Sequence, residues 1–174
     1  PSDHEIRAWQ ATMTLSERTH LLTMSDQALS QACRITVARG SGRGGQKRNR
    51  TESAVRVTHE PTGISATCDQ SRSQQTNRRL ALRKLRLELA LGCRCPTDSP
   101  YRGPWRPGRK ATEYPLWVAW VLDVLDESDW RVSEAARKLE VSTGRLVRDL
   151  SADPAAWQTV NAERARRGYG KLRA

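Results

Sequence analysis

The sequence predicts an α+β protein, in which a small mixed or antiparallel sheet with one basic helix precedes an all-helical module with a helix-turn-helix-like pattern. Runs that alternate apolar and polar residues, as half-buried strands do, lie between residues 33 and 68. From residue 73 onward, leucines recur at helical spacing instead. A stretch rich in Pro and Gly, residues 93–115, separates this part from the C-terminal helices and is expected to be a basic linker.

Composition restricts the class of partner. The chain has 174 residues, with 30 Lys and Arg against 19 Asp and Glu, and a formal net charge of +11. Such an excess of positive charge favours a polyanionic partner, nucleic acid first. No stretch reaches the roughly 18 consecutive apolar residues of a membrane span, so no membrane partner is expected. The first residues lack the pattern of a secretory signal, and the expected location is the cytoplasm.

The N-terminal part is expected to form helices followed by three strands. Capping-box patterns at residues 2–5 and 14–17 predict a helical lead-in over residues 1–30. The alternating runs that predict strands are residues 33–39, 53–59 and 64–68. Residues 61–63, Pro-Thr-Gly, predict a hairpin turn between the last two, because Pro presets φ and Gly permits a φ above zero.

One basic amphipathic helix follows the sheet. It is expected to begin after Ser73 as N-cap and to stop at Gly92, with six leucines between them. Between Asp69 and Glu88 the chain has basic residues and no acid. These cations either form a solvated helix face or contact RNA phosphates. The candidates for RNA contact here are Arg72, Arg78, Arg79, Arg83 and Lys84.

The C-terminal module, residues 116–162, is expected to be entirely helical. Residues 116–125 carry an apolar stripe typical of a core helix. Residues 133–150 have the spacing of a helix-turn-helix, with Ser142 as N-cap of the second helix. Asp153 and Pro154 then suit the cap and first position of a further helix.

A basic tail, residues 163–174, is expected after this module. Its cations are further candidates for RNA contact: Arg164, Arg166, Arg167, Lys171 and Arg173.

The connection between the first two expected strands is the segment with the strongest chemical signal. Residues 40–45 contain four glycines, which permit positive φ and close approach to another molecule. No acid occurs in this segment before Glu52. On composition alone, the segment is either a flexible solvated loop or a loop that enters a crowded anionic site. The candidate RNA-binding cations within and beside it are Arg39, Arg43, Lys47, Arg48 and Arg50.

The order of motifs from residue 34 to residue 91 resembles the catalytic domain of class I peptide chain release factors. The tripeptide Gly44-Gly45-Gln46 is followed by SAVRVTH at 53–59, PTG at 61–63, and RSQ at 72–74 with Asn77 in the basic helix. The resemblance covers about a third of the chain. The family usually has His-Val after the Gln, where this sequence has Lys47-Arg48.

This resemblance implies hydrolysis of the ester between a nascent peptide and P-site tRNA, with Gly44, Gly45 and Gln46 as catalytic residues. A backbone N–H and a neutral amide can orient water and stabilise an oxyanion without any titrating group, so neither a metal nor a cofactor is expected. The implied partner is the ribosome, through 23S-type rRNA and P-site peptidyl-tRNA. Gln46 is also an expected target of N5-methylation by a glutamine methyltransferase, and the protein is expected to be a monomer.

Full release factors use a separate domain to read stop codons, and the sequence shows no counterpart to its motifs. A codon-independent factor that rescues stalled ribosomes is therefore expected. The expected units are a lead-in (1–30), a GGQ catalytic domain (31–92), a linker (93–115), a helical module (116–162) and a tail (163–174). Two alternatives stay open: a non-catalytic ribosome- or RNA-binding factor, and a DNA-binding regulator that reads a groove through Thr143, Arg145 and Arg148.

Overall fold

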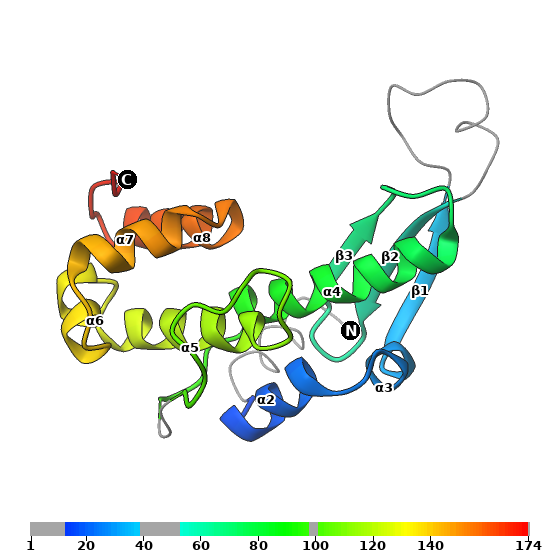
Figure 1. Ribbon diagram of the computed structural model, residues 1–174, viewed down its shortest axis with the longest axis horizontal. Coiled ribbons are helices and arrows are strands. Elements are labelled where there is room, and N and C mark those ends of the chain that lie inside the picture. The colour runs from blue at the N-terminus through cyan, green and yellow to red at the C-terminus, as the bar shows by residue number, and fades with distance from the viewer. Residues whose placement is uncertain (1–12, 39–52, 98–100, 174) are drawn as a thin grey trace.

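The computed structural model describes residues 13–38, 53–97 and 101–173, which form a three-stranded sheet and seven helices (Figure 1). The predicted α+β class with a helical C-terminal region is confirmed. The elements in chain order are α2 (Leu15–Thr23), α3 (Asp26–Gln31), β1 (Cys33–Ala38), β2 (Ala54–His59), β3 (Ser65–Cys68), α4 (Gln74–Gly92), α5 (Tyr114–Glu127), α6 (Val132–Lys138), α7 (Thr143–Ser151) and α8 (Pro154–Arg166).

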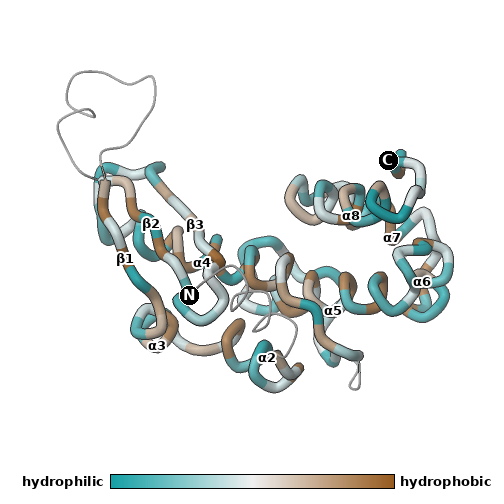
Figure 2. Tube along the Cα trace, turned by 180° about the vertical axis from the view of Figure 1, so that it is seen from behind, coloured by the Kyte–Doolittle hydropathy of each residue, from teal (hydrophilic) through white to brown (hydrophobic). Residues whose placement is uncertain are grey.

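The sheet has the order β1-β2-β3, and both pairs of strands are antiparallel. Val57 of β2 lies opposite Ile35 on one side and Ala66 on the other, so apolar side chains share one face. Hydropathy alternates along β1 accordingly (Figure 2). Helix α4 packs on β2 and β3 (Figure 1). Its buried residues include Leu82 and Leu85. The predicted strands are confirmed to within one residue at each end.

Capping residues and a turn glycine in the sequence correctly predicted where two helices begin and where the chain turns between two strands. Thr14 and Glu17 form the expected capping box of α2, whereas the pattern at residues 2–5 lies outside the described residues. Gly63 has a φ of 65° in the turn between β2 and β3. The side chain of Ser73 accepts a hydrogen bond from the Thr76 N–H at the start of α4, which ends at Gly92 as predicted.

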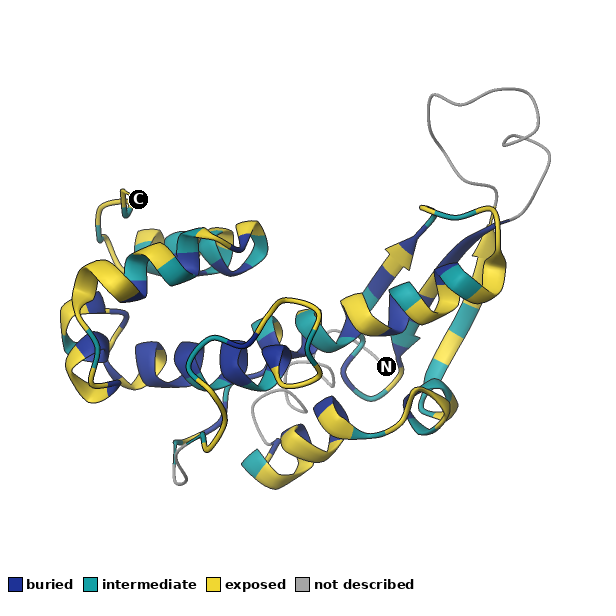
Figure 3. Cartoon of the chain, in the orientation of Figure 1, coloured by how far each residue is buried: buried dark blue, intermediate teal, exposed yellow. Residues whose placement is uncertain are grey.

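Helix α5 packs against α4 on one side and against α6 of the C-terminal helices. Ten of its 14 residues are buried, and Figure 3 shows this helix as buried along most of its length. Helices α6 and α7 form the expected helix-turn-helix, with Glu140 at a φ of 55° in the turn and Ser142 capping α7. Asp153 caps α8 as predicted. Helix α8 extends to Arg166, so the expected tail starts inside it, and Leu172 donates its N–H back to Asn161.

The segment between α4 and α5, which the sequence predicts to be a linker, packs against the hydrophobic core. Residues 93–97 and 101–113, here called the connecting segment, contain no helix or strand, as the Pro and Gly content predicted. However, Cys93 and Cys95 are buried in the core, and the ring of Trp105 lies edge-on to that of Trp117, with 5.9 Å between centroids. The two parts of the chain therefore share one hydrophobic core.

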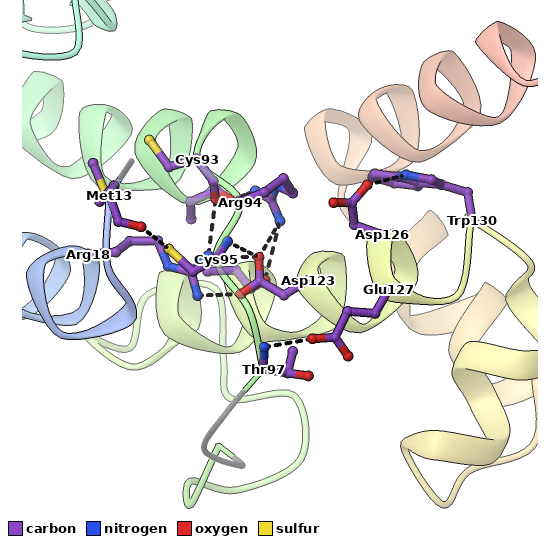
Figure 4. Close-up of polar contacts among 12 residues, drawn as sticks. Met13, Arg18, Cys93, Arg94, Cys95, Thr97, Asp123, Asp126, Glu127 and Trp130 are labelled. Carbon is purple, nitrogen blue, oxygen red and sulfur yellow. Dashed lines mark hydrogen bonds and ion pairs between the residues drawn. The ribbon is translucent and has the colours of Figure 1, made fainter. Parts of the chain in front are cut away.

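A buried ionic cluster joins three parts of the chain (Figure 4). The carboxylate of Asp123 in α5 pairs with both guanidinium nitrogens of Arg18 in α2, and lies 3.2 Å from the guanidinium of Arg94. It also accepts the Cys95 N–H at 3.1 Å, while Arg18 donates to the Cys93 carbonyl oxygen at 3.1 Å. Arg18 and Asp123 are 3% and 1% exposed, so the cluster is a buried link between α2, α5 and the residues that follow α4.

Among the helices in the part of the chain that the structure describes, none combines the length and the apolar character needed to cross a membrane.

Candidate functional site

The structure places both ends of the segment that carries Gly44-Gly45-Gln46. That tripeptide and the five cations predicted around it lie in residues 39–52, outside the described residues. Ala38, the last residue of β1, pairs with Ala54, the first residue of β2. The segment therefore starts and ends at neighbouring positions of one antiparallel pair, at one end of the sheet (Figure 1).

Asn77 holds the second of these two ends in place. This side chain lies in the first turn of α4 and is fully buried. Its amide nitrogen donates to the carbonyl oxygens of Ser53 and Ser71, at 2.6 and 2.7 Å, and its amide oxygen accepts the Ser71 N–H at 2.8 Å. One side chain thus ties the start of β2 to the segment before α4. Sequence analysis identified Asn77 only as part of the motif, because these partners lie up to 24 positions away.

Replacement of Asn77 by alanine is expected to lower the free energy of unfolding by about 2–3 kcal/mol, because it leaves the buried carbonyl oxygen of Ser53 and part-buried backbone groups of Ser71 without their partner. Urea denaturation followed by circular dichroism measures this loss. Gln75→Ala, in the same helical turn but exposed, is the matched control, with an expected change within about 0.5 kcal/mol. Equal stability of the two variants would contradict the anchoring role of Asn77.

The histidine and the thiols near the sheet are in packed positions. His59 is buried at the other end of β2 from Ala54, with its Nδ1 2.9 Å from the Thr62 hydroxyl, and burial lowers its pKa. Burial also raises the pKa of the Cys93 thiol to about 11. The four cysteines are unpaired, and the described ranges contain no group of three His, Cys, Asp or Glu side chains that could hold a metal ion.

The predicted RNA-contacting cations of α4 and of the turn before it lie on the surface. Arg72, Arg78, Arg79, Arg83 and Lys84 are all exposed. Arg83 donates to the carbonyl oxygen of Arg109 at 2.8 Å, and Lys84 to that of Thr67 at 3.1 Å. Within the described ranges, none of the five forms an ion pair with a carboxylate. They remain candidates for contact with an external anion.

The cations of the predicted tail fall into two groups. Arg164 donates to the Trp130 carbonyl oxygen at 2.7 Å, while Arg166 and Arg167 both pair with Glu163. Arg167 also pairs with Asp126 and Asp129, so Arg164 and Arg167 hold the C-terminal segment against the end of α5, whereas Arg166 and its partner Glu163 lie in the same helix. Lys171 and Arg173 are exposed and have no carboxylate partner among the residues described. Charge alone could not separate the two groups, because Trp130 and Asp126, which contact Arg164 and Arg167, lie more than 30 positions away.

Of the three residues that would read a DNA groove, one is engaged by other side chains of the chain. Thr143 and Arg148 are exposed on α7. The guanidinium of Arg145, however, lies 5.4 Å from the ring centroid of Trp105 and 3.8 Å from Asp149, to which the Trp105 ring nitrogen donates at 2.7 Å. The connecting segment thus occupies part of the first turns of α7, where a groove-reading helix would need to be open.

Two basic residues of the connecting segment were missed by sequence analysis. Arg109 and Lys110 are exposed and lie beside α4, on a cleft that also includes the start of α8. The signal available was a basic pair directly after Gly108 in a Pro-rich stretch, but its proximity to α4 depends on the packing of the whole segment.

Comparison with known proteins finds similarity to one domain family over part of the chain. The RF-1 domain matches residues 26–95, which include α3, the whole sheet and α4. Over 56 residues, 32% of this chain, the sequence is 55% identical to peptide chain release factor 1 of Mycoplasma pneumoniae and covers 16% of that protein.

Two further relatives give the same picture. Identity is 57% over 56 residues with the mitochondrial peptide chain release factor 1-like protein of Rattus norvegicus, where 32% of this chain aligns with 15% of the relative. It is 49% over 67 residues with peptide chain release factor 2 of Paramagnetospirillum magneticum, where 38% of this chain aligns with 18% of the relative. The chain thus matches less than a fifth of the length of each. Residues 26–95 match the RF-1 domain, and the chain is similar to peptide chain release factors over about a third of its length.

Proposed function

We propose that this protein releases peptides from stalled ribosomes, independently of any codon, by hydrolysing the ester of peptidyl-tRNA at the peptidyl-transferase centre. The observation that carries the proposal is the position of Gly44-Gly45-Gln46 inside the matched RF-1 domain. Identity of about half with release factors over this domain supports the same reaction class. The paired ends of β1 and β2, with the Asn77 anchor, support a role for the intervening segment as the reactive part.

The proposed reaction does not require a side chain that gains or loses a proton. Water attacks the ester carbonyl carbon, negative charge develops on the carbonyl oxygen, and the bond to the tRNA 3′ oxygen breaks as that oxygen gains a proton. We assign the Gln46 backbone N–H to the developing charge and its side-chain amide to the placement of water. Gly44 and Gly45 leave room for close approach of the backbone. The amide of Gln46 is also our candidate for N5-methylation by a glutamine methyltransferase.

Binding to the ribosome is assigned to the exposed cations. Those of α4 have no carboxylate partner within the described ranges, which favours contact with phosphates of 23S-type rRNA or of tRNA. Lys171 and Arg173 are the candidates near the C-terminus, since Arg164, Arg166 and Arg167 already have partners within the chain. We propose that the protein acts as a monomer in the cytoplasm.

We also propose that release by this protein does not depend on a codon. The aligned release factors share only the RF-1 domain with this chain, and helices α5 to α8 lie outside the match. We assign recognition of the stalled ribosome to these helices and to the connecting segment.

Peptide release from ribosomes with labelled peptidyl-tRNA tests the proposal. Complexes with an empty A-site codon position, a sense codon and a stop codon, and isolated large subunits, are compared in parallel. Release from complexes without a stop codon is expected. Release only at stop codons would contradict codon independence, and binding without release on every complex would favour the non-catalytic ribosome-binding factor.

A further inference from the structure

A cleft of about 1040 Å³ lies between the RF-1 domain and the C-terminal helices. One wall is the exposed side of α4, and another is the connecting segment at residues 109–112. The start of α8, at Asp153 to Ala155, and residues 23–26 between α2 and α3 complete it. The cleft therefore exists only because the C-terminal helices pack against the RF-1 domain.

The charge of this cleft is strongly unbalanced. Two acids and six cations line it: Asp26, Asp153, Arg79, Arg83, Lys84, Arg86, Arg109 and Lys110. Both acids are engaged, because Asp26 pairs with Arg86 at 2.7 Å and Asp153 lies 3.3 Å from Arg109.

The carboxylate of Asp153 is held by neighbours on several sides. It accepts the Tyr114 hydroxyl at 2.7 Å and the backbone N–H groups of Ala155 and Ala156. Burial alone would raise the pKa of Asp153, but these hydrogen bonds and Arg109 keep it below its ordinary value. Four cations of the cleft, Arg79, Arg83, Lys84 and Lys110, have no carboxylate within ion-pair distance among the residues described, although Lys84 lies near enough to Glu88 to favour its charged form.

We propose that this cleft binds the phosphate backbone of single-stranded RNA, as a second RNA contact separate from the segment that carries Gln46. Four cations without carboxylate partners, contributed by α4 and the connecting segment, suit several consecutive phosphates. Half-buried Leu80 and Leu87 add apolar surface that free phosphate would not require and that bases can cover. An RNA duplex turns its bases inward and is recognised mostly by shape, so it would leave this apolar surface unused.

The test measures RNA binding by the full chain directly, with fluorescence anisotropy of a labelled, unstructured RNA of about 15 nucleotides. With four phosphates neutralised, the slope of log K against log salt concentration is expected to be about −3. The double variant Arg79→Gln/Lys110→Gln is expected to bind about 25-fold more weakly at 0.1 M salt and to reduce the slope by about 1.4.

Matched controls separate the cleft from general charge. Arg137→Gln/Lys138→Gln removes two exposed cations of α6 outside the cleft, and its affinity is expected to change by less than about 3-fold. An equal loss in both double variants would overturn the proposal, since binding would then follow net charge. Cleft-dependent binding of a poly-glutamate peptide, or of duplex RNA, that is tighter than that of single-stranded RNA would overturn the assigned partner.

The proposal deepens the ribosomal role proposed above, but the two can fail separately. Gln46→Ala is expected to keep the RNA affinity of the wild-type protein, because Gln46 belongs to the segment between β1 and β2. If the cleft binds RNA but the protein releases no peptide, only the proposed hydrolysis is contradicted. If peptide release depends on Gln46 but the cleft binds no RNA, only the proposed RNA contact is contradicted.

Discussion

Replacement of Gln46 by alanine is expected to slow peptide release by about 100-fold, because loss of precise positioning of a reacting water typically has an effect of this size. Alanine keeps the backbone N–H that we assign to the developing oxyanion, so the effect isolates the side-chain amide. Single-turnover release from ribosomes with labelled peptidyl-tRNA, at saturating protein, measures the rate.

A neighbouring substitution shows whether the loss is specific. Lys47→Ala removes a charge next to Gln46, so it is expected to weaken ribosome binding and to leave the saturated rate nearly unchanged. Co-sedimentation with ribosomes supplies the affinity of each variant. If Gln46→Ala released peptides at the wild-type rate, the assignment of Gln46 as the residue that positions water would be wrong.

Replacement of Asp123 by alanine is expected to lower the free energy of unfolding by about 3–5 kcal/mol. The reason is the burial of its partners: Arg18 is 3% exposed and would retain its charge in the core, and Arg94 would lose its ion pair at the same place. The Cys95 N–H would also lose its acceptor. Chemical denaturation at neutral pH measures the loss.

An exposed acid provides the comparison for Asp123. Glu134 lies on the surface of α6, 3.8 Å from Arg131, and both side chains are about half exposed. Glu134→Ala is expected to change stability by less than about 1 kcal/mol. A loss of that small size for Asp123→Ala would show that water reaches the cluster after the substitution and replaces the carboxylate.

The parts of the fold that depend on neighbouring residues were predictable from the sequence. Alternation identified the strands, and the hydroxyls of Thr14, Ser73 and Ser142 identified helix starts, because a cap and its N–H partner are only three positions apart. Gly63 identified the turn between β2 and β3, because a positive φ is a local requirement that glycine meets.

The parts that depend on distant residues were not predictable. The packing of Trp105 against Trp117 and Trp120 turns an expected linker into part of the core, and no local pattern specifies this contact. The same holds for Arg18, a cation in a helical lead-in whose partner Asp123 is 105 positions away. For the site, the sequence identified the cations of α4, but the cleft that they share with Lys110 exists only in the folded chain.

The shared core also restricts how the gene for this protein can be cut and recombined. A fragment that ended before α5 would leave Arg18 without its carboxylate and would expose the apolar surface that α5 covers, even though residues 26–95 match a complete family domain. Attaching another helical module at the same point would fail for the same reason, unless it supplied an acid where Asp123 stands. We therefore expect the C-terminal helices to contribute to the stability of residues 26–95 in this chain, because the two parts share one hydrophobic core.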